Sequence, residues 1–495
     1  MKTNTDDLRL PPQTKFIIGN EACERFSYYG MIAILTLYMV RVLGMSEAEA
    51  TGVMHTFKAA VYFLPLAGAW LADRWLGRYW TILSLSFFYC LGHGVLAVSE
   101  GSTGGLYLGL ALIAVGAGGI KPCVSAFVGD QLASVQERAL LKAYSLFYWS
   151  INFGSFFAFG LIPTIRENYG YSWAFGIPGI AMAMATFIFW LGTRHYVRVP
   201  PRRGAQAAGF LRVFLHAWAR RRTRRPGQSF FDVATGRFSR EEVEGARAVA
   251  GILGIFATVP VFWALFDQTH STWVLQGEKM TPVTLLAFGV DPAGRGWMVP
   301  FIKLLCTETA PGQFALVLNS ERMQTLNPLL VMLLIPVFTA WLYPASEKLG
   351  FKPTALRRMS VGMVLGATSF VVCGWLQVRM DRGESLSIAW QMMPYLILTA
   401  GEVMVSATGL EFAFAQAPPS LKSTIMSLWL LTFAVGNYLV VVVTRVNTTF
   451  VKASGAAAFF FYAALLFVVG GIFIWTALRY RERQFGVASG TPSQG

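Results

Sequence analysis

The sequence predicts an all-α polytopic membrane protein with about twelve membrane-spanning helices in two bundles of six. Of its 495 residues, 55% are hydrophobic and only 14% are charged, whereas soluble proteins carry nearer a quarter of charged residues. Apolar runs of 20 or more residues recur along the chain, each long enough to cross a bilayer as a helix. A strongly basic connector separates six of these runs from the other six.

The twelve runs give the expected helices in chain order. The first six lie near residues 15–43, 48–71, 80–98, 105–128, 140–165 and 173–196, and the second six near residues 248–275, 326–349, 359–378, 388–413, 424–446 and 456–478. We expect an N-terminal bundle over residues 1–196, a linker over 197–247 and a C-terminal bundle over 248–495. An extracytoplasmic insertion near 277–324 has no role that the sequence reveals. Two halves of this kind are typical of transporters built from repeats.

The basic residues predict the orientation of the chain. A net charge of +15 could indicate a nucleic-acid-binding protein, but the arginines and lysines gather in alternate loops, as Arg74 and Arg78 do after the second run. Such clusters face the cytoplasm under the positive-inside rule. We therefore expect a multi-pass protein of the cell (inner) membrane, monomeric, with both termini cytoplasmic and with no nucleic-acid partner.

The basic linker over residues 197–247 predicts contact with lipid. Apolar residues recur in it at helical spacing among arginines: Phe210, Val213, Phe214 and Trp218. This pattern predicts an amphipathic helix on the anionic lipids of the inner leaflet. Ser239, followed three residues later by Glu242, predicts a capped helix that leads into the seventh run.

The sequence offers no pattern for a metal, a cofactor or an enzyme. The five cysteines are scattered and form no CxxC pair, so metal and redox chemistry find no support. An integral membrane enzyme could use intramembrane carboxylates and histidines for acid–base work. The chain lacks the nucleophile–base motif or cofactor loop that such an enzyme needs, and we expect no enzymatic activity.

The first run carries a stripe of ionisable residues. Glu21, Glu24 and Arg25 are spaced i, i+3 and i+4, so a helix places them on one face, and Tyr28 and Tyr29 continue that face. Burying each charge in a spanning helix costs about 2.5–3.5 kcal/mol. Such groups face a water-filled cavity or pair with one another, so the stripe indicates a transport path. An ion pair that only locks helices together is the alternative.

Other polar residues interrupt the later runs. They are His55, Lys58 and Tyr62 in the second run, Lys121 in the fourth, Trp263 and Asp267 in the seventh, Asn327 at the start of the eighth, Glu402 and Ser406 in the tenth, and Trp429 and Asn437 in the eleventh. Any one of them could be a packing residue or an interhelical hydrogen bond worth under about 1 kcal/mol. Together they set cations in the first half against anions in the second, which suits a short zwitterion.

Several longer motifs resemble one family. The loop after the second run, GAWLADRWLGR, is similar to the loop signature of the major facilitator superfamily. Further motifs follow in order: EACERFSYYG over residues 21–30, GGIKPCVSAF over 118–127, Tyr148 with Asn152, FWALFDQ over 262–268, and GLEF over 409–412. With these, the chain resembles the proton-coupled oligopeptide transporters (POT/PTR family) of that superfamily, over nearly its whole length.

The resemblance implies roles for individual residues. It implies that Arg25 and Lys121 hold the carboxylate of a peptide, and that Asn152, Asn327 and Glu402 hold its amino terminus. The implied cavity wall consists of Tyr28, Tyr29, Tyr62 and Tyr148, and the implied side-chain pockets of Trp263, Ser406 and Trp429. The implied proton-coupling residues are Glu21, Glu24, Arg25, His55 and Asp267.

The resemblance also implies a function and leaves alternatives. It implies proton-coupled symport of di- and tripeptides by alternating access, driven by the proton gradient without a cofactor. Transport of nitrate or another small anion is one alternative, and a peptide sensor that binds without flux is another.

One position departs from the family. Many members have arginine where this chain has Ile32, facing the acidic residue that corresponds to Asp267. Lys121 and Lys58 are the two candidates for the missing gate charge. The sequence leaves open whether Lys58 fills this role or extends its amine to the membrane surface.

Overall fold

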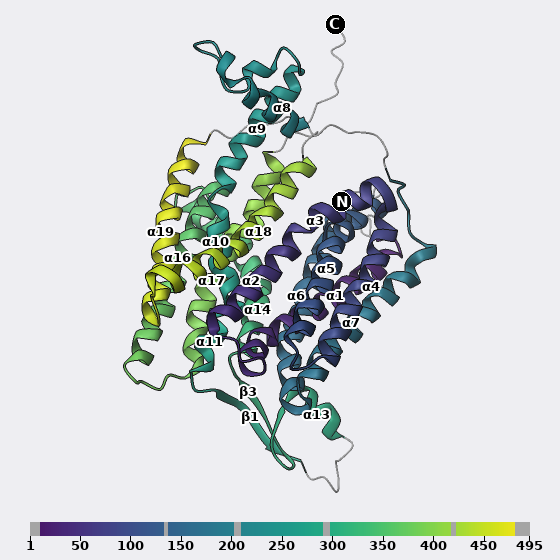
Figure 1. Cartoon of the computed structure of the whole chain (residues 1–495), viewed down its shortest axis with the longest axis vertical. Helices are drawn as coiled ribbons and strands as arrows, with labels where there is room; N and C mark the ends of the chain where they lie inside the picture. The colour runs from purple at the N-terminus through teal and green to yellow at the C-terminus, as the bar shows by residue number, and fades with distance from the viewer. Residues whose placement is uncertain (1–9, 133–136, 202–208, 291–297, 417–421, 481–495) are drawn as a thin grey trace.

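The computed structural model describes residues 10–132, 137–201, 209–290, 298–416 and 422–480, which form mostly helices (Figure 1). The N-terminal bundle consists of α1 (Thr14–Arg41), α2 (Glu47–Phe63), α3 (Pro65–Leu71), α4 (Gly77–Val98), α5 (Thr103–Gln131), α6 (Glu137–Tyr169) and α7 (Tyr171–Leu191). The C-terminal bundle consists of α9 (Arg240–Phe256), α10 (Val259–Phe266), α11 (Thr272–Glu278), α14 (Leu326–Val337), α15 (Tyr343–Lys348), α16 (Ala355–Asp381), α17 (Met392–Ala415), α18 (Lys422–Val446) and α19 (Ala456–Arg479).

Each bundle crosses the membrane six times. Among the described residues, nine helical stretches are long and apolar enough to span a bilayer, and α9 joins α10 and α11 at a bend of 41° to make a tenth. The stretch Glu47–Val98 crosses twice, because the chain reverses between α3 and α4, and α1 supplies one further crossing with its 28 residues. The predicted fold of about twelve spanning helices in two bundles is thereby confirmed.

A glycine makes the reversal between α3 and α4 possible. The π-helical turn Ala72–Leu76 ends at Gly77, whose φ of +74° lies in the left-handed region that side chains with a Cβ rarely adopt. Arg78, the next residue, pairs with Asp130 at the end of α5. This ion pair holds the turn against the neighbouring helix.

The seventh crossing is broken in its middle, although the sequence predicted a continuous span. Pro260 stands in the first turn of α10, where its missing N–H is tolerated. After Phe266 the chain tightens into the 3₁₀ turn Asp267–His270, and α11 begins only at Thr272. Irregular backbone at membrane depth is stable only inside protein or beside a cavity. The break therefore places Asp267 between the two bundles.

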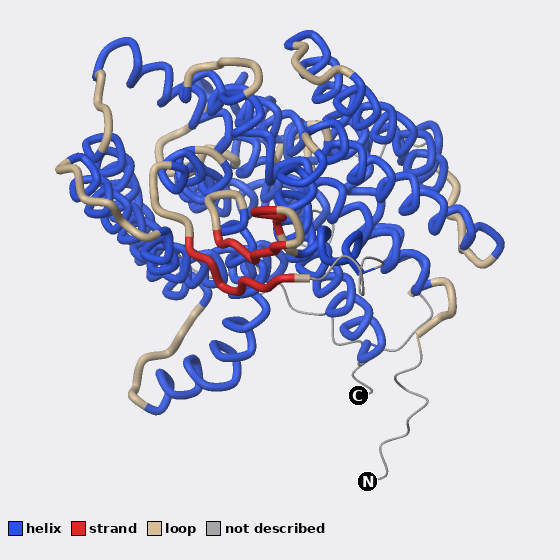
Figure 2. The backbone as a smooth tube through the Cα atoms, turned by 90° about the horizontal axis from the view of Figure 1, so that it is seen from below, coloured by secondary structure: helices blue, strands red, loops and turns tan. Residues whose placement is uncertain are grey.

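The insertion after α11 forms a small antiparallel sheet. Its strands are β1 (Val283–Gly289), β2 (Thr307–Ala310) and β3 (Gln313–Leu318), in the order β1-β3-β2. Figure 2 shows the strands in red. The short helix α13 (Val299–Leu305) precedes β2 and packs against α6. Figure 1 shows the sheet at the end of the molecule opposite to the end where α19 finishes. We call these the sheet end and the termini end.

The basic linker folds on itself. The predicted helix is present as α8 (Gly209–Ala219), and Ser239 with Glu242 forms the predicted capping box of α9. The expectation that the Phe210–Val213–Phe214 face lies on lipid is wrong, because Val213 is fully buried in a small core and both phenylalanines pack against that core. The linker is thus a compact unit in which this face of α8 packs on protein.

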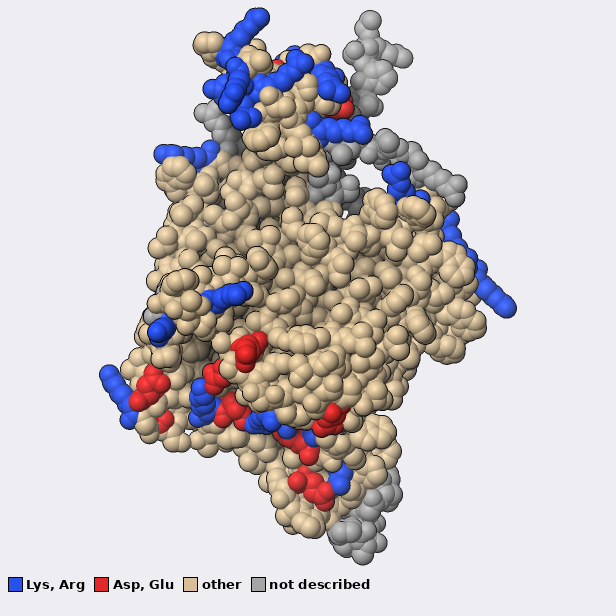
Figure 3. Space-filling model, viewed as in Figure 1, with Lys and Arg blue, Asp and Glu red and all other residues tan. Residues whose placement is uncertain are grey.

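A different face of α8 stays exposed. Leu211, Leu215 and Trp218 lie at i, i+4 and i+7, and each is more than half exposed. Figure 3 shows lysine and arginine side chains gathered over this part of the molecule, at the termini end. Of the four residues of the predicted apolar face, Trp218 is exposed, and it shares its exposed face with Leu211 and Leu215.

Polar contacts join the two bundles at the sheet end. The pairs are Arg41 with Glu278, Lys279 with Glu47, Arg166 with Glu321, Arg322 with Glu167, Thr36 with the carbonyl of His270, and Gln324 with the carbonyl of Ala33. The Nε and Nη2 atoms of Arg166 lie 3.0 and 2.6 Å from one oxygen of Glu321, which is fully buried. These contacts close the sheet end.

We expect this closure to depend on pH through Glu321. Burial raises the pKa of Glu321 to about 7, although Arg166 beside it acts in the opposite direction. Separation of the bundles would expose the carboxyl and return its pKa toward 4.5, so the closed state binds the proton more tightly. Lowering the pH from 8 to 6 should favour closure by about 1 kcal/mol. This stabilisation of the closed state is fully present below pH 4.5 and is lost as the pH rises through 7.

Distances between spin labels on the two bundles at the sheet end, measured by pulsed electron spin resonance, check this pH dependence. Glu321→Gln should remove most of it. Glu47→Gln is the matched control at the same end, because the Glu47 side chain is half exposed in its pair with Lys279, and it should retain the dependence. A Glu321→Gln variant that closes with the wild-type pH dependence would contradict the assignment.

A close helix crossing supports the polar stripe of α1. A Cβ at Gly154 of α6 would meet the carbonyl oxygen of Ala22 and lie 3.1 Å from the backbone nitrogen of Phe26. Gly154→Val should therefore push α6 away from α1 and lower stability by about 1–3 kcal/mol, the usual cost of overpacking. Thermal unfolding of the purified protein measures the loss. Gly160→Val on the same helix is the control, because nothing lies within 4 Å of a Cβ there, and equal melting of the two variants would refute the close approach.

Candidate functional site

A cavity of about 150 Å³ lies between the two bundles. Its wall includes Tyr28, Tyr29, Lys58, Tyr62, Tyr148 and Asn152 from the N-terminal bundle, and Asp267, Asn327, Glu402 and Ser406 from the C-terminal bundle. All ten are residues that the sequence predicted for binding, coupling or gating. Helices from both halves of the chain therefore bring residues more than 370 positions apart to one place.

The Glu21–Glu24–Arg25 stripe lies inside the N-terminal bundle. The Nε atom of Arg25 is 2.7 Å from an oxygen of Glu21 and 2.7 Å from an oxygen of Glu24. The three residues are at most 8% exposed, so each charge has a partner where water is scarce. They precede Tyr28 and Tyr29 of the cavity wall by one to two turns of α1. One cation thus balances two carboxylates directly beside the cavity.

Lys121 lies between this stripe and the cavity. Its Nζ atom is 4.0 Å from the ring centre of Tyr62 and 4.9 Å from that of Tyr28, which is cation–π geometry. It extends from α5 beside Pro122, in the middle of the helix. The amine is held by aromatic faces, and among the described residues no carboxylate forms an ion pair with it, which leaves its charge available to an incoming anion.

The buried partner of Asp267 is Lys58. The amine of Lys58 pairs with Oδ1 of Asp267, and both residues are at most 4% exposed. The sequence offered Lys121 as the other candidate for this gate charge, but the structure places its amine against Tyr28 and Tyr62. The reason is geometric, because α2 packs against α18 beside the break that carries Asp267. Ile32, where the family often has arginine, is buried and apolar.

On the opposite side of the cavity, an amide holds a carboxylate. The Nδ2 atom of Asn327 donates to Glu402 at 2.6 Å and to the hydroxyl of Thr399 at 3.2 Å. Asn152 lines the cavity from α6 and donates to the carbonyl of Tyr148 at 3.0 Å. Glu402 has no cationic partner among the contacts of the described residues, so it can receive a cation from a ligand.

Sequence reasoning missed several cavity residues and misplaced two tryptophans. Phe159, Phe266, His270 and Phe433 also line the wall. Trp263 and Trp429 are buried behind Phe433, and the ring of Trp263 stacks on Phe433 at 3.8 Å. The signal for Phe433 was present, because Trp429, Phe433 and Asn437 repeat every four residues on one face of α18.

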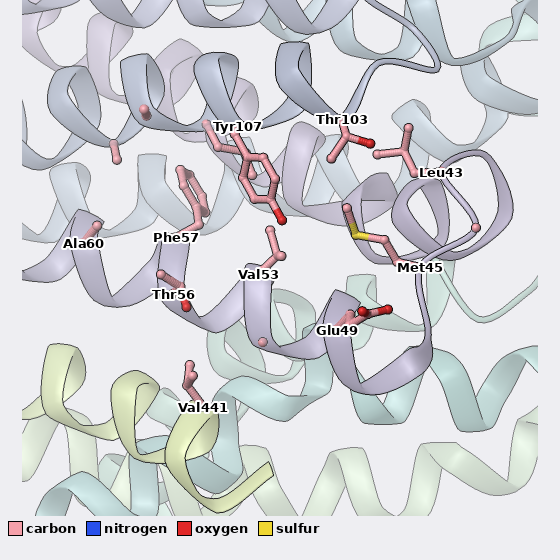
Figure 4. A pocket seen from close by; sticks show the side chains of 15 residues that line it. Leu43, Met45, Glu49, Val53, Thr56, Phe57, Ala60, Thr103, Tyr107 and Val441 are labelled. Atoms are coloured by element: carbon pink, nitrogen blue, oxygen red, sulfur yellow. The ribbon is translucent and has the colours of Figure 1, made fainter. Parts of the chain in front are cut away.

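A larger hollow lies elsewhere. It measures about 780 Å³ between α2, α5 and Val441 of α18, toward the sheet end (Figure 4). Figure 4 shows Tyr107 reaching from α5 toward Val53 of α2 across this hollow. It holds none of the predicted site residues. A choice of site by cavity volume alone would therefore have missed the cavity that the predicted residues line.

The site contains charges for binding and no group of metal ligands. Among the described residues, no group of three or more histidine, cysteine, aspartate or glutamate side chains could hold a metal ion. The cavity wall instead includes Glu402, and its tyrosines Tyr28 and Tyr62 contact the amine of Lys121 from behind the wall. It can hold a small molecule with an anionic and a cationic end.

Comparisons with known proteins agree with this geometry. The sequence profile of the POT family matches residues 79–311 and 307–460. Peptide transporter family 1 of Drosophila melanogaster is 38% identical over 389 residues, which are 75% of this chain and 48% of that protein. Solute carrier family 15 member 1 of Homo sapiens is 36% identical over 399 residues, 74% of this chain and 52% of that protein. The chain spans about half the length of the curated relatives it matches.

Solved structures share the fold over the whole chain. The crystal structure of an auto-inhibited POT family peptide transporter has 38% identity and a TM-score of 0.82, and the match covers 98% of this chain and 99% of that one. A POT peptide transporter in complex with alafosfalin has 25% identity and a TM-score of 0.74, and covers 97% of this chain and 98% of that one. On the family profile and on these full-length matches, the chain belongs to the POT family.

Proposed function

We propose that this chain is a proton-coupled symporter that takes up di- and tripeptides by alternating access. The observation that carries the proposal is the cavity between the bundles: the amine of Lys121 contacts the cavity tyrosines Tyr28 and Tyr62, and Glu402 with Asn327 lines the wall from the C-terminal bundle. A peptide of two or three residues is a zwitterion whose ends are a few ångströms apart, and it fits this separation of charge. The name of the Drosophila relative, peptide transporter family 1, and that of the solved auto-inhibited peptide transporter support the same substrate class.

The roles of the cavity residues follow from their contacts. Lys121 and Arg25 bind the peptide carboxylate, and Glu402, Asn327 and Asn152 bind the amino terminus. Tyr28, Tyr29, Tyr62, Tyr148 and Ser406 surround the backbone, and Trp263 and Trp429 support the aromatic wall from behind Phe433. A charge-assisted hydrogen bond is shorter and about twice as strong as a neutral one, so the two ends give most of the affinity.

Proton coupling arises from competition for Arg25. In the empty site Arg25 neutralises Glu21 and Glu24 together. A peptide carboxylate that takes the guanidinium leaves a buried glutamate without its partner, and a proton then replaces the lost charge. Peptide and proton thus favour each other's binding, which is the coupling that symport requires.

The Lys58–Asp267 pair acts as the gate. It lies between α2 of one bundle and the broken seventh crossing of the other, so the pair exists only while the sheet end is closed. A proton on Asp267 weakens the attraction and favours separation of the bundles. Ligand and proton act by shifting this equilibrium and need no covalent step.

We further propose that the termini end faces the cytoplasm and that the linker touches the inner leaflet. Support comes from the exposed apolar side chains of Leu211, Leu215 and Trp218 next to the arginines of residues 220–225. Apolar side chains among cations bind anionic lipid surfaces. The protein acts as a monomer in the cell membrane, because each chain forms a complete cavity from its own two bundles.

Uptake into proteoliposomes tests the proposed function. Labelled dipeptide should accumulate when the outside is made acidic, and unlabelled tripeptide should compete while nitrate should not. Accumulation of nitrate in place of peptide would replace the proposal with transport of a small anion. Binding of peptide without any flux would identify a sensor.

Removal of the gate cation provides a second test. Lys58→Ala leaves Asp267 as a buried unpaired charge, at a cost of about 3–5 kcal/mol to the closed sheet end, so proton-driven accumulation should fall at least tenfold. Lys58→Ala with Asp267→Asn removes both charges and should restore part of the closure. Thr56→Ala, an exposed position on the same helix, is the control. Normal transport by Lys58→Ala with an unchanged pH profile would show that Lys58 is not the gate cation.

A further inference from the structure

Asn437 of α18 lies at the junction between the two bundles and is fully buried. Its Nδ2 atom is 2.5 Å from Oδ2 of Asp267 and 3.0 Å from the carbonyl oxygen of Phe433. Its Oδ1 atom is 2.8 Å from Nδ1 of His55, and Nε2 of His55 is 2.8 Å from the hydroxyl of Ser271. One amide therefore connects His55 on α2 with Asp267 in the broken crossing.

The partners fix which way the amide points. The Phe433 carbonyl and the ionised carboxylate of Asp267 only accept hydrogen bonds, so the NH₂ group of Asn437 faces them. The oxygen of Asn437 then faces His55, and because this oxygen only accepts, Nδ1 of His55 must carry a hydrogen. In neutral His55 the other ring nitrogen accepts from Ser271. With Asp267 ionised, every bond in the chain Ser271–His55–Asn437–Asp267 points toward the carboxylate.

A proton on Asp267 reverses this chain. Lys58 donates to Oδ1 of Asp267, so a proton that arrives while this pair is intact goes to Oδ2. When the resulting hydroxyl donates to Asn437, the amide turns its oxygen toward Asp267 and its NH₂ group toward His55. The ring of His55 then accepts at Nδ1 and carries its hydrogen at Nε2, where Ser271 accepts it. The reversed arrangement keeps the bonds from Ser271 to Asp267 only with a neutral His55, and it loses the bond from the amide to the Phe433 carbonyl.

We propose that Asn437 is a relay that makes protonation of His55 and protonation of Asp267 mutually exclusive while the sheet end is closed. A charged His55 has hydrogens on both ring nitrogens and fits only the orientation that needs an ionised Asp267. A protonated Asp267 fits only the orientation that needs a neutral His55. If His55 and Asp267 were both protonated, Asn437 would face two donors with only one acceptor atom to offer, and a buried donor would stay unpaired. Leaving a buried donor unpaired is costly. The junction therefore holds one proton and not two.

Asn437 acts as a positioning residue, and this role rests on the proposed proton-coupled function.

Other ionisable groups also face the junction. They are Lys58 and Tyr62 from α2, His270 from the broken crossing, Tyr28 and Tyr29 from α1, and Glu402 from α17. The Nδ1 atom of His270 bonds to Gln324, which is not part of the hydrogen-bonded series from Ser271 to Asp267. Among the described residues, only the amide of Asn437 bonds to both His55 and Asp267.

Nuclear magnetic resonance of the purified protein tests the relay without any transport. The ring ¹⁵N shifts of His55 and the carboxyl ¹³C shift of Asp267, assigned with His55→Gln and Asp267→Asn, are followed from pH 8 to pH 4.5. In the wild type, neutral His55 should carry its hydrogen at Nδ1 when Asp267 is ionised, and the two groups together should take up one proton. A wild-type His55 with its hydrogen at Nε2 beside an ionised Asp267, or uptake of two protons at the closed junction, would overturn the proposal.

The variant Asn437→Leu keeps the branched shape and the number of side-chain heavy atoms and removes the relay. His55 and Asp267 should then titrate independently and take up two protons, and the pH midpoint of peptide uptake should move upward by about one unit, because the ionised carboxylate loses a hydrogen-bond donor. Thr444→Val on the same helix is the control and should behave as the wild type in both measurements. Single-proton uptake that persists in Asn437→Leu would overturn the relay. If peptide uptake is absent from the wild type but its junction takes up one proton, the proposed function fails while the relay stands.

Discussion

The buried ion pair between Lys58 and Asp267 is the interaction on which the closed arrangement of this protein depends. Both side chains are almost inaccessible, and they belong to different bundles. In such a setting neither charge is stable alone, because removal of water from an ion costs several kcal/mol unless a partner compensates it. The pair therefore holds the bundles together strongly, yet a single proton is enough to change its balance.

The other buried charges of the site are also compensated, but each to a smaller extent than in the Lys58–Asp267 pair. Arg25 serves two carboxylates at once, Lys121 is held by aromatic faces, and Glu402 is held by an amide. Each of these charges has enough support to remain buried in the empty protein, but less than a full ionic partner of its own. The proposed zwitterionic substrate would supply the missing partners at both ends.

The sheet-end closure and the cavity are mechanically connected. The insertion after α11 contributes Glu321 and Arg322, which bind Arg166 and Glu167 of α6 across the bundles. The 3₁₀ turn of the seventh crossing carries both Asp267, which pairs with Lys58, and His270, which bonds to Gln324 beside the sheet-end pairs. A change of charge at any of these points acts on the same interface, because the contacts all join α1, α2 and α6 to the C-terminal bundle.

The sequence by itself determined the twelve crossings, the two bundles and most of the cavity residues. Spanning helices need about 20 apolar residues, and a charge within such a run is costly enough to mark a functional site. Only the tertiary structure decided which charges pair, because pairing depends on how helices far apart in sequence cross. Lys58 and not Lys121 reaches Asp267, Phe433 and not Trp263 forms the wall, and Val213 of the linker packs on protein and not on lipid. Helical periodicity shows which face of its helix a residue occupies. Which helix packs against that face is decided only when the bundles assemble.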